Sequence, residues 1–127
     1  MKGAIYSLNA AISFIATVGL IRAGGVWIPV NPRNSAQDNV AVLRQFGCDA
    51  LFFQKAFTEP VKAFAESSEP LVSMVCLDGD HTVHPTLERW MAGASASAPT
   101  VSRAPTDLVT IPLTGGTTGL PKGVMLS

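Results

Sequence analysis

The residues best suited to bind a ligand lie in the stretch LTGGTTGLPKGVMLS, residues 113–127. Positions 114–121 are only Gly, Thr, Leu and Pro, and Lys122 follows. Backbone amides can converge on one volume only where no side chain blocks close approach, which glycine allows. Threonine hydroxyls add uncharged donors, and a lysine ammonium can reach phosphate oxygens. The stretch therefore predicts a polyphosphate-binding loop, and its candidate residues are Thr114, Gly115, Gly116, Thr117, Thr118, Gly119 and Lys122.

Two other phosphate motifs do not fit this stretch. In the pattern GxxxxGK[ST], a glycine precedes the lysine and a serine or threonine follows it to ligate magnesium. Here Pro121 precedes Lys122 and Gly123 follows it. The dinucleotide pattern GxGxxG is also absent, because GGTTG has the wrong spacing and no helical pattern follows. The remaining alternative is a glycine-rich hairpin in which Lys122 is merely solvated.

The elements that must position this loop follow from the pattern of apolar residues. Strands and helices are expected to alternate along the chain, with Asn9, Ser35 and Thr58 as N-caps. The alternation predicts an α/β fold with a mainly parallel sheet and helices on its faces, where ligands sit at the carboxyl ends of strands. The expected strands are 4–8, 26–30, 50–54, 71–77 and 107–114, and the expected helices are 10–23, 36–46, 58–66 and 85–94.

Two local features refine this arrangement. Pro29 places the strand 26–30 at a sheet edge or near its own end, because proline cannot donate to a ladder. Residues 94–105 lose periodicity and gain Ser, Ala and Pro, which predicts a loop before the last strand.

Composition narrows the function class. The 127 residues are 47% hydrophobic and suit one domain. Nine basic and nine acidic residues cancel, so no charge excess indicates a nucleic-acid partner. Small-molecule chemistry is the better expectation.

The cysteines and histidines add little chemistry. Cys48 and Cys76 are isolated, which favours a reduced, cytoplasmic setting over a disulfide framework or a thiolate zinc site. His81 and His84 have HxxH spacing, which could hold a metal, but their Gly, Pro and Asp-rich surroundings favour a solvated turn. No metal site is predicted.

The first residues imitate a signal peptide or a membrane anchor. Lys2 is followed by nineteen uncharged residues before Arg22. Polar residues and glycines interrupt the run, and no small-x-small cleavage site follows. We therefore expect a buried strand and a buried helix here, with no membrane span.

The stretch 113–127 resembles the phosphate-binding signature of the adenylate-forming enzymes, which include acyl-CoA synthetases, luciferases and peptide-synthetase adenylation domains. The signature usually reads [YF]-T-[SG]-G-[ST]-T-G-x-P-K-G-V, and Leu113 departs from it at the aromatic position. Upstream, FIATVGLIRAGGVWIPVNPRNS also resembles this family, so the similarity covers about residues 4–127. Asn31 and Pro32 look more like acyl-CoA synthetases than peptide-synthetase domains.

The resemblance implies a ligase that activates a carboxylic acid with ATP and Mg²⁺ to an acyl-adenylate and passes the acyl group to CoA, as in fatty acid metabolism. Residues 114–119 would then wrap the leaving pyrophosphate, and Lys122 would offset its charge. No catalytic residue is assigned, and the acyl substrate is not indicated.

Family members are considerably longer than this chain. We therefore expect residues 1–127 to form part of the large N-terminal domain, as a fragment or a truncated product that is inactive alone. Its open faces would need the rest of the enzyme or an oligomeric partner to cover them. The alternative is a non-catalytic α/β module for nucleotide binding or protein interaction.

Overall fold

Four parallel strands form the centre of the protein in a computed structural model, which describes residues 1–66, 71, 73–97, 99–114 and 122–127. The spatial order of the strands is β2-β1-β3-β4, and all three neighbouring pairs are parallel. The α/β class with a parallel sheet is therefore confirmed. The strands are β1 (Lys2–Tyr6), β2 (Val26–Pro29), β3 (Ala50–Phe53) and β4 (Ser73–Cys76).

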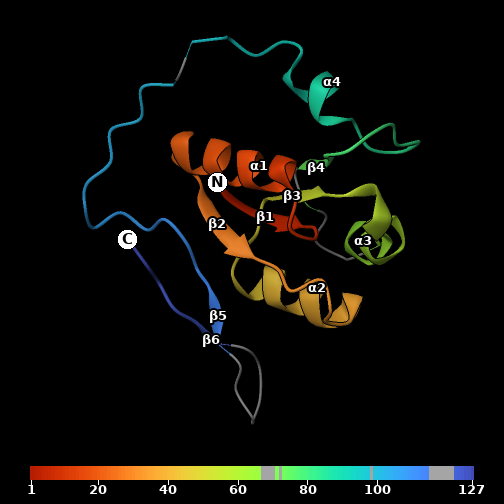
Figure 1. Ribbon diagram of the computed structural model, residues 1–127. Coiled ribbons are helices and arrows are strands. Elements are labelled where there is room, and N and C mark those ends of the chain that lie inside the picture. Colours follow the sequence, from red (N-terminus) through yellow and green to blue (C-terminus); the bar gives the residue numbers. More distant parts are fainter. Residues whose placement is uncertain (67–70, 72, 98, 115–121) are drawn as a thin grey trace.

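Helices cover both faces of this sheet (Figure 1). One face carries α1, and the other carries α2 and α3. A 3₁₀ turn, η1, directly precedes α3, and a short helix, α4, follows β4. The helices are α1 (Ala11–Arg22), α2 (Ala36–Gln45), η1 (Lys55–Phe57), α3 (Thr58–Ala65) and α4 (Leu87–Met91).

Alternating side chains of the strands build two cores, because successive residues of a strand point to opposite faces. Toward α2 and α3, the sheet buries Tyr6, Leu51 and Phe53 together with Val61 and Phe64 of α3. Toward α1, it buries a second set: Ile5, Ala50, Phe52, Val75 and Leu77.

Strand β1 begins earlier than the sequence pattern predicts, at Lys2 instead of residue 4. The Lys2 amide donates to the Asp49 carboxylate at 2.7 Å, and the Asp49 amide donates back to the Lys2 carbonyl at 2.8 Å. The Lys2 ammonium also donates to the Phe46 carbonyl at 2.8 Å, at the C-cap of α2. These partners are distant in sequence, so the local pattern did not reveal them.

Of the three predicted N-caps, only Ser35 is confirmed. Its hydroxyl accepts the Asp38 amide at 3.1 Å. The prediction for Asn9 is wrong, because α1 is capped by Ala10 with no side-chain hydrogen bond. Thr58 is the first residue of α3 instead of its cap, because η1 leads straight into the helix and the Thr58 hydroxyl donates to the Lys55 carbonyl.

Helix α1 has no polar face. Its inner side lies on the sheet, while Phe14 and Ile15 are 71% and 60% exposed on its outer side. Within the described residues, no helix has the length and apolarity to cross a membrane.

Residues 109–111 extend the sheet beyond β2. The Trp27 amide donates to Val109 and the Ile111 amide donates to Trp27, both at 2.9 Å, in a parallel arrangement. The next bond in this ladder would need an amide hydrogen on Pro29, which proline lacks. The predicted strand 107–114 is therefore not continuous. It consists of isolated bridges from Thr110 to Trp27 and Leu126 and of the short strand β5 (Leu113–Thr114).

Candidate functional site

The predicted phosphate loop leaves and rejoins the protein through a short antiparallel hairpin. Strand β5 pairs with β6 (Lys122–Gly123), with Leu113 opposite Gly123 and Thr114 opposite Lys122. The Thr114 hydroxyl donates to the Lys122 carbonyl at 3.1 Å and closes the neck of the loop. Gly115, Gly116, Thr117, Thr118 and Gly119 lie outside the described residues.

The structure brings Thr114 and Lys122 together, as the loop prediction requires. Paired residues of an antiparallel ribbon project to the same side, so the hydroxyl and the ammonium share one face. Both residues are exposed. A hairpin without a ligand would show the same pairing, so the pairing alone does not separate the two interpretations of this stretch.

The hairpin lies beyond the carboxyl end of the sheet. Residues 109–111 run parallel to β2, so the chain passes the end of β2 before it reaches Thr114 (Figure 1). The returning segment is tied to the same edge, because Val124 donates to Pro112 at 2.9 Å and Leu126 donates to Thr110 at 3.0 Å. Ligands of open α/β sheets bind at this end.

Arg103 fixes the segment that leads into the hairpin, and the sequence pattern did not single it out. Its guanidinium donates to the carbonyls of Ile21 at 3.4 Å and Gly25 at 3.2 Å, and also to the carbonyl of Leu108. Ile21 lies in the last turn of α1, where backbone carbonyls lack helical partners. Arg103 therefore ties the end of α1 and the start of β2 to the strand beside them.

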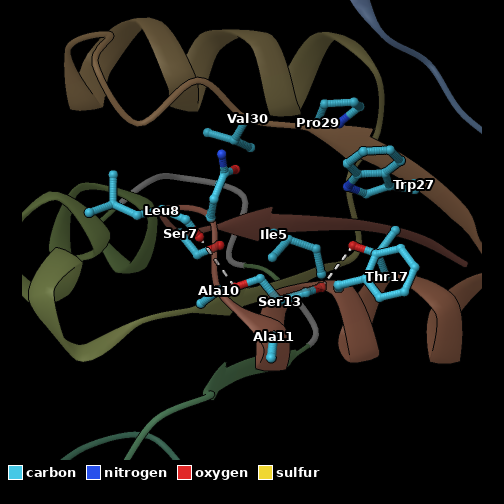
Figure 2. A pocket seen from close by; sticks show the side chains of 12 residues that line it. Ile5, Ser7, Leu8, Ala10, Ala11, Ser13, Thr17, Trp27, Pro29 and Val30 are labelled. Carbon is cyan, nitrogen blue, oxygen red and sulfur yellow. Dashed lines mark hydrogen bonds between the residues drawn. The ribbon is translucent and has the colours of Figure 1, made fainter.

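A hollow of about 650 Å³ opens between α1 and the carboxyl ends of β1 and β2. Figure 2 shows Trp27 of β2 and Thr17 of α1 on either side of it, with Ile5 of β1 between them. The Trp27 indole N–H is buried and has no hydrogen-bond partner among the described residues. None of the lining residues is charged.

His81 and His84 pack against each other in a turn. The rings stack with centroids 5.2 Å apart, and His81 Nδ1 accepts the backbone amides of Val83 and His84 at 3.2 and 3.1 Å. An accepting Nδ1 leaves the proton of the neutral ring on Nε2, which is buried. Across the described ranges, no group of three or more His, Cys, Asp or Glu side chains could hold a metal ion. The histidines instead organise a turn.

The burial of His84 in this turn predicts that the protein loses stability in acid. Burial, with a smaller contribution from His81, lowers the pKa of His84 below its ordinary value of 6.5. The folded state therefore resists protonation of His84, so its contribution to stability is present above about pH 6.5 and is lost as the pH falls through the folded pKa. We expect Tm to fall as the pH is lowered below about 6.5, and to fall less in His84→Gln. An equal fall of Tm with decreasing pH in the unchanged protein and in His84→Gln would contradict this assignment.

Neither cysteine is suited to act as a nucleophile. Both are free thiols, and burial raises the pKa of Cys48 to about 11 and also raises that of Cys76. A thiol must lose its proton to attack or to ligate a metal. Both cysteines are therefore part of the packed sheet region.

With the geometry in place, comparison with known proteins decides the family. A model of the family described as AMP-binding enzyme matches residues 2–127. This chain belongs to that family. Membership of the adenylate-forming enzymes is thereby confirmed, and a solved CoA ligase shares the arrangement of the four-stranded sheet and its helices.

Relatives of this AMP-binding chain carry out different named reactions. It is 34% identical over 112 residues to Tyrocidine synthase 3 of Brevibacillus parabrevis, which covers 88% of this chain and 2% of that protein. It is 27% identical over 119 residues to 4-coumarate–CoA ligase 1 of Petroselinum crispum, which covers 94% of this chain and 22% of that protein. The relatives thus include both a tyrocidine synthase and a CoA ligase.

A solved structure agrees with the fold. The crystal structure of a long-chain-fatty-acid-CoA ligase from Archaeoglobus fulgidus superposes with a TM-score of 0.85 at 26% identity, over 99% of this chain and 24% of that chain. This AMP-binding chain thus spans less than a quarter of the lengths of the proteins compared here.

Proposed function

We propose that this chain supplies the triphosphate-binding part of the ATP site in a ligase that activates a carboxylic acid as an acyl-adenylate. The observation that carries the proposal is the match of the AMP-binding family model to residues 2–127, a range that includes the glycine- and threonine-rich stretch and Lys122. The neck of the hairpin, where Thr114 and Lys122 are paired, is compatible with this assignment. Residues 114–119 and Lys122 are the proposed ligands.

In this proposal the acid attacks the α-phosphate and pyrophosphate leaves. The lysine ammonium lowers the energy of the charge that builds on the leaving group, an effect that is largest in the transition state. Mg²⁺ is proposed to bind together with ATP, and within the described residues no group of three or more His, Cys, Asp or Glu side chains could hold it. CoA is the proposed acceptor of the acyl group, and residues 1–127 are proposed to be part of a larger N-terminal domain with a loop at 94–105.

The proposal predicts that Lys122→Ala weakens binding of ATP and Mg²⁺ by about tenfold. Loss of one charge-assisted hydrogen bond at a partly solvated site costs about 1.5 kcal/mol, which corresponds to that factor. Isothermal titration calorimetry on the 127-residue chain measures the change. Lys62→Ala is the matched control, because Lys62 is exposed on α3 and pairs with Glu59 at 2.7 Å.

Competition experiments locate the contact on the nucleotide. We expect pyrophosphate to displace ATP and AMP to displace it poorly, because the proposed ligands hold the β- and γ-phosphates. Binding that Lys122→Ala leaves unchanged would remove Lys122 from the site. If pyrophosphate and ATP bind no better than inorganic phosphate, the assignment of this stretch as a triphosphate loop is wrong.

A further inference from the structure

Gly123 is the point at which the returning strand of the hairpin touches the core. A Cβ atom added at this position would lie 2.4 Å from Cγ2 of Ile111 and 2.8 Å from the ring edge of Phe46. Ordinary contacts of a Cβ atom begin near 3.4 Å, so the added atom would be about 1 Å too close to Ile111. The φ angle of Gly123 is not in the left-handed region. The position therefore requires glycine for space and not for its backbone conformation.

Neither neighbour can easily move away. Ile111 is 4% exposed, and its amide is bonded to the Trp27 carbonyl at 2.9 Å. Its Cγ2 methyl is attached directly to Cβ, so no flexible stem can swing it aside. Phe46 is held at the C-cap of α2, where its carbonyl accepts the Lys2 ammonium and its amide donates to Val42 at 3.1 Å. An added methyl group would therefore push the returning strand outward and leave the core in place.

We propose that Gly123 is a positioning residue for Lys122: by allowing the returning strand to lie against Ile111 and Phe46, it sets the height of the lysine above the core. This inference rests on the proposed role of Lys122 at the triphosphate. Lys122 is the neighbour of Gly123, and its carbonyl receives the Thr114 hydroxyl. A shift of about 1 Å at Gly123 therefore moves the ammonium and disturbs the Thr114 contact together, and displacements of this size weaken oriented contacts.

The direct test is ATP and Mg²⁺ binding by Gly123→Ala, measured by calorimetry on the 127-residue chain after circular dichroism has shown that it is folded. We expect binding about tenfold weaker than in the unchanged protein. Gly93→Ala is the matched control, because a Cβ at Gly93 meets nothing within 4 Å. It should leave the affinity unchanged. A full-affinity Gly123→Ala would overturn the inference.

A double-mutant cycle separates positioning from a general structural effect. If Gly123 acts through Lys122, then adding Gly123→Ala to Lys122→Ala should cause little further loss of affinity. Losses that add in full would contradict the inference. If the unchanged protein binds neither ATP nor pyrophosphate, the proposed function itself fails, which is a different result.

A second variant removes the closer of the two contacts. Ile111→Ala removes the Cγ2 atom and leaves the Phe46 ring edge 2.8 Å from the added Cβ, so Gly123→Ala should cost less affinity in that background than in the unchanged protein. Should Gly123→Ala alone fail to fold, comparison of Ile111→Ala with the double variant carries the test. An equal cost of Gly123→Ala in both backgrounds would show that contact with Ile111 does not set the position of Lys122.

Discussion

Replacing Phe53 by alanine is expected to lower the free energy of unfolding by about 3–5 kcal/mol, the usual cost of removing a fully buried phenylalanine. Phe53 is 0% exposed and ends β3, the strand between β1 and β4. Its ring lies edge-on to His81 and His84, with centroids 5.3 and 5.7 Å away. Truncation would therefore leave a cavity and also loosen the histidine turn.

Urea unfolding followed by circular dichroism measures this effect. Phe14→Ala is the matched control, because the Phe14 side chain is 71% exposed on α1 and should contribute little to the stability of the monomer. Since stabilities of small domains are about 5–15 kcal/mol, Phe53→Ala should leave a protein close to unfolding. Equal midpoints for the two variants would mean that the sheet does not pack around Phe53 as described.

Arg103→Ala is expected to cost about 2–3 kcal/mol, the second largest effect. Its guanidinium joins the carbonyls of Ile21, Gly25 and Leu108, and a hydrogen bond from a charged donor contributes about 1.5–3 kcal/mol. We expect less than the sum of the three hydrogen-bond contributions, because the Arg103 guanidinium is only part-buried.

Arg103→Lys tests the geometry of this contact. A lysine keeps the charge but lacks the planar fork that reaches several carbonyls at once, so it should recover less than half of the loss. Arg33→Ala, at an exposed arginine in the turn after β2, serves as the control. Full recovery by lysine would show that charge near the end of α1 matters and that the fork does not.

The sheet could be predicted from the sequence, because each strand is a short apolar run and a helix follows it before the next strand. The N-cap Ser35 was also predictable, because a cap is a local interaction between residues three apart. Asn9 was not, because Asn9 and Ala10 both precede the helix and only the fold decides which of them has the extended backbone of a cap.

The last strand and its support depend on long-range contacts. Pro29 and Thr110 lie in different parts of the sequence, and only the bridge between Trp27 and Thr110 shows why pairing stops near Thr110. Arg103 contacts carbonyls that are 78 and 82 residues away along the chain. For the phosphate loop, residue types indicated the candidates, but the closeness of Gly123 to Ile111 needed coordinates.

The exposed apolar side chains of α1 affect how the protein behaves in solution. The outer side of α1 exposes phenylalanine and isoleucine to water. Covering it with another apolar surface lowers the free energy of the system. If that surface belongs to a second copy of this chain, the Tm of the protein rises with protein concentration, because folding and association become one linked equilibrium. Dilution would thus act on this protein as a mild denaturant.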